Sequence, residues 1–299
     1  MAGLWAAGGS RWPLTAAMGL MTLGLGIKSG LFPFYFWMPD TYGYATPAAA
    51  GVLSGLVSKG YLFLLVKLIC NVFGAEIFRA SGLGPLVFTL GLAGMLLGSA
   101  SAMAEADLFR MLSYSSAAQI GYIFLGLGLS PALGLAAALF QILTHALTKP
   151  ALFLCASRLS AAAGGARHFP GLQGAARADR AAGLLFALGA FSMIGVPGTM
   201  GFLVKYRLAQ CALAEGWQLW PAILGLAFST ILNTCYFGRA VLRLYAQRPE
   251  SGPAAPARKG RPAFQAAAGL LLALNLALGL HPQPLLGLLE RGLALLSSQ

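Results

Sequence analysis

Residues 26–39 read Gly-Ile-Lys-Ser-Gly-Leu-Phe-Pro-Phe-Tyr-Phe-Trp-Met-Pro and place a proline just after a lysine in a long apolar stretch. Residues 195–205 read Gly-Val-Pro-Gly-Thr-Met-Gly-Phe-Leu-Val-Lys and place the breakers just before a lysine. Proline removes a backbone donor and glycine lets the chain unwind, so both stretches predict interrupted helices. Interruptions in corresponding places of two halves indicate a transport site near the middle of a membrane. Ordinary proline kinks are the alternative. We therefore expect helix breaks at Pro33, Pro197 and Gly198.

The composition indicates an integral membrane protein. Of 299 residues, 58% are hydrophobic and 9% are charged, whereas a soluble domain carries roughly 25% charged residues. Lipid forces the backbone to satisfy its own hydrogen bonds, and an apolar run of roughly 20 residues does so as a spanning helix. We expect an all-α fold with one transmembrane domain over residues 1–299. Its eight expected spans are 13–37, 47–70, 83–103, 112–130, 132–157, 182–212, 217–245 and 263–280.

Four lysines lie inside these apolar spans, while all eight acidic residues lie in connections or near span ends. A lysine at bilayer depth costs about 2.5–3.5 kcal/mol on insertion scales, so it is a candidate functional residue by default. Because burial makes an amine easier to deprotonate, a series of such lysines predicts a proton relay. The four lysines are Lys28, Lys59, Lys149 and Lys205.

Lys59 lies deep in the second span, beyond the reach of a side chain that extends to the membrane surface. Ser54 and Ser58 precede it by five residues and one residue. We expect both serines to support the relay by holding water or sharing a proton. Lys67 is close to the span end, where contact with the interface explains it, so it is left out of the relay.

The fifth span carries a polar ladder in an otherwise apolar helix. Gln141, His145 and Lys149 follow each other at intervals of four residues and share one helix face, and Thr144 and Thr148 lie alongside. Histidine changes its charge near neutral pH, and a desolvated lysine releases its proton easily. A lone histidine is more often a satisfied core residue, but this spacing favours a proton wire that faces a hydrated interior.

In the sixth span, Arg207 is the alternative buried cation to Lys205. The position of Lys205 beside the break favours the lysine, because arginine stays charged and rarely donates a proton. We expect Asn233 and Asn275 to form helix–helix hydrogen bonds rather than site contacts.

The net charge of +12 is explained by membrane topology rather than by nucleic acid. With eight spans, the odd-numbered connections share one side and both termini share the other. The odd connections hold nine basic residues: Arg110, Arg158, Arg167, Arg177, Arg180, Arg248, Arg258, Lys259 and Arg261. We therefore expect cytoplasmic loops at 157–181 and 246–262 and both termini on the non-cytoplasmic side. An interfacial tail is expected at 283–299, with a short amphipathic helix at Pro284–Leu296.

Several kinds of site are not indicated by the sequence. It has no P-loop, no dinucleotide fingerprint, no CxxC or paired-histidine metal motif, and no nucleophile beside a base. The four cysteines are scattered without paired spacing. This pattern is typical of cysteines that pack as small buried hydrophobic residues. We therefore expect no catalytic residue, no metal and no cofactor in this chain.

Five separated stretches resemble the antiporter-like subunits of respiratory complex I. The same family supplies large subunits of multisubunit cation/proton antiporters and membrane subunits of membrane-bound hydrogenases. The matching stretches, in order, are 28–40, 45–59, 107–122, 144–154 and 195–205.

The resemblance implies that Lys28 is the pumping lysine on the first broken helix and that Lys59 is its neighbour. It also implies that His145 and Lys149 are central connecting residues and that Lys205 is the terminal residue toward an exit half-channel. Some members carry glutamate in place of Lys205, which favours the antiporter-complex and hydrogenase types for this chain.

The chain also departs from the family pattern. Members have about fourteen membrane helices that include two inverted repeats. This chain is expected to begin in the second half of the first repeat, so the glutamate that partners the first lysine lies in the missing part. Gln141 stands where many relatives have a further histidine. We expect a fragment, a shortened product, or a separate chain that supplies the rest.

The sequence therefore predicts a proton-translocating subunit of a redox-driven or antiporter complex in the cell inner membrane. Its expected partners are other membrane subunits, protons and the lipid bilayer, with sodium as an alternative coupling ion. The complex would be of the NADH:quinone oxidoreductase or hydrogenase type, with the redox centres elsewhere. Two alternatives remain open. One is an independent secondary transporter of a small ion, such as an anion held by fixed lysine charges. The other is a structural membrane subunit or truncated paralogue without transport of its own.

Overall fold

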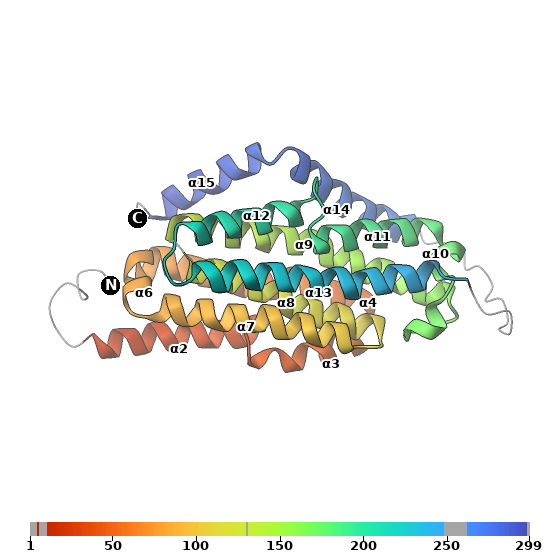
Figure 1. Cartoon of the computed structure of the whole chain (residues 1–299), viewed down its shortest axis with the longest axis horizontal. Helices are drawn as coiled ribbons and strands as arrows, with labels where there is room; N and C mark the ends of the chain where they lie inside the picture. The colour runs from red at the N-terminus through yellow and green to blue at the C-terminus, as the bar shows by residue number, and fades with distance from the viewer. Residues whose placement is uncertain (1–4, 6–10, 130, 248–261, 298–299) are drawn as a thin grey trace.

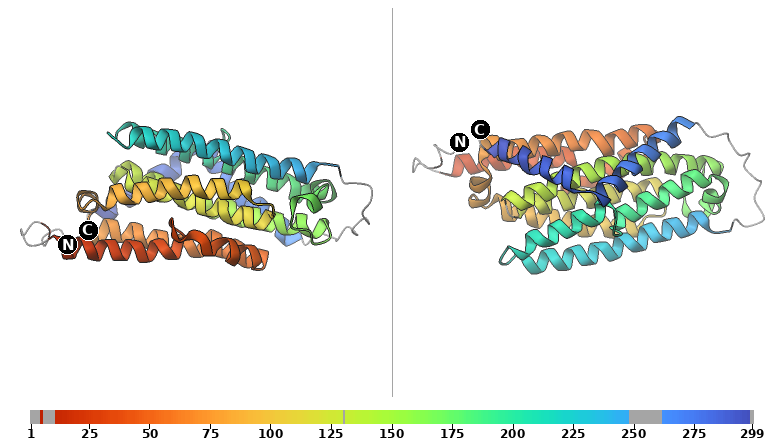
Figure 2. Two further views of the ribbon diagram at one scale, coloured as in Figure 1. Left: turned by 60° about the horizontal axis from the view of Figure 1, so that its bottom comes forward. Right: turned by 90° about the horizontal axis from the view of Figure 1, so that it is seen from above.

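A computed structural model describes residues 5, 11–129, 131–247 and 262–297 of the chain, and most of them are helical. No strand occurs among these residues, in which a single β-bridge pairs Asp107 with His168. The helices run along the long axis of one bundle, and α2 begins at the same end where α15 finishes (Figures 1 and 2). The expected all-α membrane fold is confirmed.

The elements follow one another in two groups along the chain. The first group is α2 (Trp12–Ser29), the 3₁₀-helix η1 (Phe34–Phe36), α3 (Trp37–Tyr44), α4 (Pro47–Val52), the π-helix η2 (Leu53–Val57), α5 (Ser58–Lys67), the π-helix η3 (Leu68–Phe73), α6 (Ala75–Ala80), α7 (Leu83–Ala104) and α8 (Leu108–Gly128). The second group is α9 (Pro131–Ala162), the 3₁₀-helix η4 (Phe169–Leu172), α10 (Ala175–Ala178), α11 (Arg180–Ile194), α12 (Met200–Leu213), α13 (Leu219–Tyr245), α14 (Pro262–Leu280) and α15 (Gln283–Ser297).

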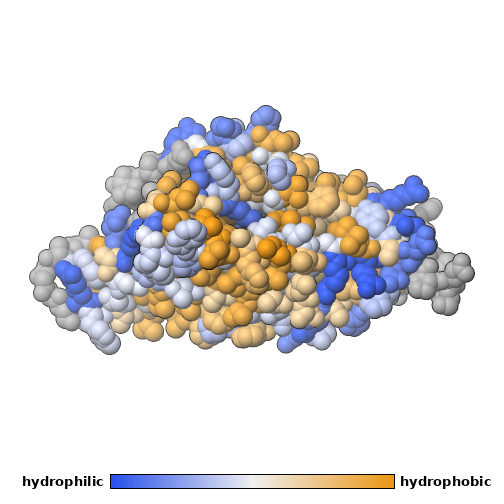
Figure 3. All heavy atoms as spheres, viewed as in Figure 1, coloured by the Kyte–Doolittle hydropathy of each residue, from blue (hydrophilic) through white to orange (hydrophobic). Residues whose placement is uncertain are grey.

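Six helical segments of the described chain are long and apolar enough to cross a membrane. They are Trp12–Tyr44, Pro47–Phe73, Leu83–Ala104, Leu133–Ala162, Leu219–Tyr245 and Pro262–Leu280. The other two expected spans correspond to α8 and to the pair formed by α11 and α12. All residues of α8 except Arg110 and Tyr114 are buried, so this helix forms the centre of the bundle. Hydrophobic side chains cover the middle of the face seen in Figure 3, and hydrophilic ones gather toward its ends, as a bundle embedded in lipid requires.

Both helix interruptions predicted from the sequence are present. After α2, Gly30 adopts the left-handed region (φ 95°), and the chain passes through the break that contains Pro33 before α3 begins. After α11, Gly195 (φ 91°) and Gly198 (φ 90°) adopt the same region on either side of Pro197. Only glycine adopts this conformation without strain, so the glycines fix where each helix stops.

The second span is also irregular, which the residue pattern did not predict. Between Pro47 and Phe73 the chain passes from α-helix into the π-helix η2, back into α5, and then into the π-helix η3. A π-helix widens the turn and changes which backbone carbonyls are paired, and such segments often occur at functional sites. Lys59 is the second residue of α5, which begins where η2 ends.

The loops and the tail differ slightly from the expected boundaries. α9 continues to Ala162, so the connection after it begins later than residue 157. The expected loop at 246–262 lies mostly outside the described residues, which stop at 247 and resume at 262. The expected tail helix is present as α15, which meets α14 at an angle and packs on α9 and η3 (Figure 2). Its position at the membrane interface stays a prediction.

Close backbone contact between α7 and α8 holds the centre of the bundle together. A Cβ atom added to Gly121 would lie 2.3 Å from the backbone nitrogen of Met95, and one added to Gly91 would lie 2.4 Å from that of Leu125. Small residues of this kind let helices approach closely in lipid, where packing replaces the hydrophobic driving force.

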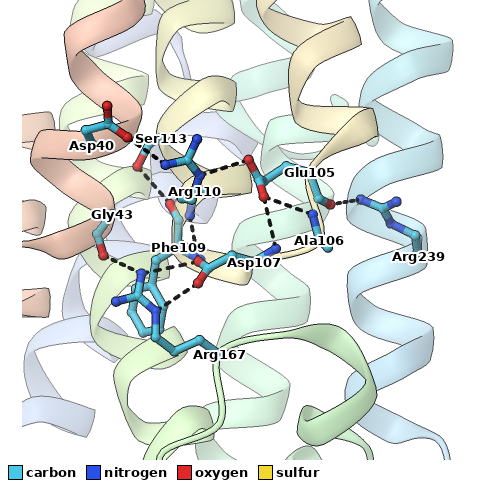
Figure 4. A network of polar contacts seen from close by, with 10 residues as sticks. All are labelled: Asp40, Gly43, Glu105, Ala106, Asp107, Phe109, Arg110, Ser113, Arg167 and Arg239. Atoms are coloured by element: carbon cyan, nitrogen blue, oxygen red, sulfur yellow. Dashed lines mark hydrogen bonds and ion pairs between the residues drawn. The ribbon is translucent and has the colours of Figure 1, made fainter.

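A network of ion pairs holds the corner between α7 and α8 (Figure 4). The Asp107 carboxylate accepts hydrogen bonds from two backbone N–H groups at the start of α8 and pairs with Arg167 at 2.8 Å. Arg110 pairs with Glu105 at 3.0 Å and with Asp40 at 2.6 Å. The network therefore joins α3, the α7–α8 corner and the connection after α9.

Asp107→Ala is expected to lower the free energy of unfolding by about 2–3 kcal/mol. The change removes the cap of α8 and leaves Arg167 without its carboxylate, and Asp107 is only 5% exposed. Asp40→Ala is the matched control, because the Asp40 side chain is 69% exposed and such ion pairs contribute less than about 1 kcal/mol. Thermal unfolding of the purified protein in detergent compares the two, and equal losses would contradict the assignment.

Candidate functional site

Three of the candidate relay residues form a buried cluster at the centre of the bundle. Lys149 and His145 on α9 are 0% exposed, and Lys59 on α5 is 5% exposed. His145 lies within electrostatic range of both lysines, and the two lysines lie within range of each other. No lysine of the described chain takes part in an ion pair, so the cluster holds its cations without a carboxylate.

Lys59 is held by the irregular turn that precedes it. Its ammonium group donates to the backbone carbonyl of Ser54, within η2, and to the Ser58 hydroxyl at 3.1 Å. The Ser54 hydroxyl is 3.0 Å from that of Ser116 on α8. Both predicted supporting serines therefore contact the lysine, Ser54 through its carbonyl and Ser58 through its hydroxyl.

A glycine–proline contact fixes η2 against α9. A Cβ atom added to Gly55 would lie 2.2 Å from Cγ of Pro150, the proline inside α9. Pro150 directly follows Lys149, so the irregular turn that carries the carbonyl for Lys59 packs beside the second buried lysine. Close packing of two irregular segments thus brings the two amines within electrostatic range of each other.

The polar side chains of α9 contact several different partners rather than one another. Gln141 donates to the side-chain oxygen of Gln119 on α8 at 2.5 Å. Thr144 and Thr148 donate to carbonyls of their own helix at 2.8 and 2.7 Å. Neither ring nitrogen of His145 has a hydrogen-bond partner among the described residues. A fully buried imidazole in this state has both nitrogens free for exchangeable partners, water above all.

Lys149 reaches across to α8. Its ammonium group donates to the Leu112 carbonyl at 2.8 Å and to the Ser115 hydroxyl, and it lies 5.9 Å from the centre of the Phe237 ring on α13. A cation over an aromatic face is stabilised by the ring quadrupole, most strongly where water is excluded.

Lys205 lies at the second helix break. Its ammonium group donates to the Ile194 carbonyl at 2.5 Å and to the Thr230 hydroxyl at 2.9 Å, and it lies 5.7 Å from the Tyr122 ring centre. Ile194 is the last residue of α11, so the cation sits at the negative end of a helix dipole. The three buried or half-buried lysines therefore share one pattern, in which each donates to one backbone carbonyl and one side-chain hydroxyl.

Lys28 is placed differently from the other candidates. It lies in the last turn of α2, is exposed, and makes no hydrogen bond to any described residue. It lines an open groove of about 360 Å³ together with Tyr42, Ser58 and Tyr61. Ser58 thus lines the same groove as Lys28 and accepts a hydrogen bond from Lys59.

Several buried polar residues escaped the sequence analysis as site residues. Ser115, Gln119 and Tyr122 occupy one face of α8 at intervals of four and three residues, and all are buried. This spacing was the available signal, but serine, glutamine and tyrosine are mild polar residues that lipid-embedded helices also use for packing. No group of histidine, cysteine, aspartate and glutamate suited to a metal ion occurs in the described part of the chain.

Comparisons with known proteins identify similar membrane subunits. A family model described as NADH:quinone oxidoreductase/Mrp antiporter, TM, matches residues 3–232. NADH-quinone oxidoreductase subunit N of Desulforudis audaxviator is 36% identical over 232 residues, which cover 77% of this chain and 45% of that protein. NADH-quinone oxidoreductase subunit 14 of Thermus thermophilus is 34% identical over 285 residues, which cover 94% of this chain and 60% of that protein.

A solved structure gives the same picture. The match to the Mrp complex from Dietzia sp. has a TM-score of 0.83 at 25% identity and covers 94% of this chain and 59% of that one. The chain thus spans about half the length of the curated relatives it matches.

Proposed function

The chain belongs to the NADH:quinone oxidoreductase/Mrp antiporter family of membrane subunits, and from this premise we propose that it translocates protons through a relay of buried lysines. The relay runs from Lys59 through His145 and Lys149 to Lys205. Its partners are further membrane subunits of one complex in the inner membrane, and a redox reaction elsewhere in that complex or counter-transport of sodium drives it.

The observation that carries this proposal is a buried cluster of two lysines and one histidine without an acid. Because positive charges in a dry interior repel each other, the three groups cannot all be protonated at once. Protonation of one therefore favours release from the next. His145 is buried, near both lysines, and without a hydrogen-bond partner among the described residues. It is suited to pass the proton, since its ring can accept at one nitrogen and donate at the other.

Lys205 is the proposed end of the relay in this chain. It is less buried than Lys149 and sits in the break between two half-helices, where the chain is irregular. A half-helix terminus facing a charged group is a recurrent feature of transport sites. We assign it the exit side of the path.

Lys28 is the proposed entry side. Its exposed ammonium group borders an open groove, and a lysine at membrane depth needs a polar partner. A membrane segment that covers the groove and carries a carboxylate would supply one. We further propose that the connections after α9 and α13 face the cytoplasm, since they hold most of the basic loop residues, and that α15 lies at the membrane interface.

An independent transporter of small anions is the second candidate, because the lysines also form a set of fixed positive charges without acids. The two candidates differ in whether the amine must lose its proton. A charge that only binds an anion can be permanent, whereas a relay needs a group that releases its proton.

Lys59→Arg is therefore expected to slow proton translocation by the assembled complex at least about tenfold, because a guanidinium group keeps its charge and will not release a proton. The measurement is the rate of acidification in vesicles that contain the whole complex, normalised to the amount of assembled subunit. Lys59→Met should be equally slow.

Lys67→Arg is the matched control, since Lys67 is an exposed lysine of the same span. It should translocate protons at the wild-type rate. A wild-type rate for Lys59→Arg together with a slow Lys59→Met would instead favour the anion transporter, in which positive charge alone suffices.

A further inference from the structure

A second polar cluster lies between Lys149 and Lys205, and the relay above does not use it. It consists of five hydroxyls and one carboxamide from three helices, α7, α8 and α13. All of its members are at most 1% exposed. We call it the hydroxyl–amide cluster; its residues are Ser99, Ser115, Tyr122, Ser229, Asn233 and Tyr236.

At one end the cluster contacts Lys149. The Lys149 ammonium group donates to the Ser115 hydroxyl, and the rings of Phe237 and Tyr236 pack with their centres 4.7 Å apart. Tyr236 donates to the side-chain oxygen of Asn233 at 2.7 Å. The ring of Phe237, next to Tyr236, lies under the same ammonium group.

At the other end the cluster contacts Lys205. The amide nitrogen of Asn233 lies 3.5 Å from the Tyr122 hydroxyl, to which it donates. The Lys205 ammonium group lies 5.7 Å from the centre of the Tyr122 ring and donates to the Thr230 hydroxyl on α13. Tyr122 therefore touches Lys205 with its ring and the rest of the cluster with its hydroxyl.

The hydrogen bonds of this cluster have one direction. Starting from Lys149, Tyr236 donates to Asn233, Asn233 donates to Tyr122, and Tyr122 donates to Ser229 at 2.9 Å. Aligned hydrogen bonds polarise one another in a low-dielectric interior, so a change of charge at one end is felt at the other. A carboxamide neither gains nor loses a proton readily, so Asn233 makes the cluster a poor proton wire.

We propose that the hydroxyl–amide cluster couples the charge states of Lys149 and Lys205, with Tyr122 as the residue that positions Lys205. Loss of a proton by Lys149 removes the positive charge that lies over the Phe237 ring beside Tyr236. The aligned hydrogen bonds are then less polarised, which changes the stabilisation of the ammonium group at the other end. The proton itself takes another path. This inference rests on the proposed function. It adds a means by which proton release at Lys149 is coordinated with proton transfer at Lys205.

The competing explanation is that these residues only bind helices α7, α8 and α13 together, as polar side chains do in lipid. Ser99 fits that description, because its hydroxyl is 2.9 Å from that of Ser229 and bridges α7 to α13. A purely structural role predicts a loss of stability without an altered pH profile. Coupling predicts an altered profile in a complex that still assembles.

The test is the rate of proton translocation against pH for the whole complex with Tyr122→Phe, Tyr236→Phe or both changes. Each substitution removes one hydroxyl and keeps the ring. Each is expected to slow translocation about five- to tenfold, the effect of one buried hydrogen bond, and to displace the pH of the half-maximal rate by up to about one unit. The double variant should be no slower than the single ones, because both hydroxyls belong to one chain of hydrogen bonds.

Tyr35→Phe is the matched control, since Tyr35 is another buried tyrosine outside the cluster, and it should keep the wild-type rate and profile. Wild-type behaviour of both cluster variants, with Lys205→Ala inactive, would overturn the coupling and leave the relay intact. Wild-type activity of Lys205→Ala would instead contradict the proposed function. If Tyr122→Phe fails to assemble, Tyr236→Phe and Ser115→Ala decide, and failure of all three to assemble would show that the cluster is structural.

Discussion

Lys149→Met is expected to reduce proton translocation at least about a hundredfold, which is the usual contribution of a positioned proton donor and acceptor. Lys149 is fully buried at the centre of the bundle, and the other amine within its electrostatic range is Lys59. Methionine fills a similar volume but carries no exchangeable proton. The path from His145 to Lys205 would lose its middle group.

The same substitution is expected to leave the fold in place. It removes a buried cation, which is favourable, and leaves the Leu112 carbonyl and the Ser115 hydroxyl without a donor, which costs about 1–3 kcal/mol. Ser115 also donates to the Leu112 carbonyl, so part of this pairing remains. Translocation should therefore be measured per assembled complex in vesicles, with exposed Lys67→Met as the control. A wild-type rate for Lys149→Met would contradict the relay.

Gly121→Ala is expected to destabilise the fold strongly, with a loss of about 3 kcal/mol or more. The new Cβ would lie 2.3 Å from the Met95 nitrogen and 2.7 Å from both the Gly91 oxygen and the Met95 Cα. All three atoms belong to the backbone of α7, so no side chain can move away to relieve the clash. The two central helices must separate.

Gly238→Ala on α13 is the matched control, because nothing lies within 4 Å of the position of its Cβ. It should change the midpoint of unfolding little, since a helical glycine with open space at its Cβ position gains at most about 1 kcal/mol from alanine. Thermal unfolding in detergent measures both variants. Similar midpoints for the two would show that the α7–α8 contact is not limiting for stability.

The fold was predictable because lipid leaves few choices to the backbone. Apolar runs of sufficient length become helices, and the expected spans agree with the observed helices over the described residues. The breaks at Pro33 and Pro197 were predictable for a similar reason, since proline and glycine act on the backbone of their own segment. The π-helix before Lys59 was not, because it depends on how Gly55 packs against Pro150 from a distant part of the chain.

The sequence predicted only those site residues whose burial in a membrane is energetically costly. Lysines at membrane depth are conspicuous, and three of the four lie in contact with other polar groups. The spacing of Gln141 and His145 suggested a continuous ladder, but Gln141 pairs with Gln119 from another helix. Tyr122 and Tyr236 gave no signal, since a tyrosine in an apolar helix does not reveal what its hydroxyl faces.

The pairing of each inner lysine with one carbonyl and one hydroxyl has a consequence for how the sites change charge. A carboxylate partner becomes a stranded anion when its lysine loses the proton, and an unpaired buried charge costs several kcal/mol. The carbonyls of Ser54, Leu112 and Ile194 carry only dipoles and do not titrate. Such a lysine can lose and regain its proton at little electrostatic cost. Neither the protonated nor the neutral form is therefore a kinetic trap.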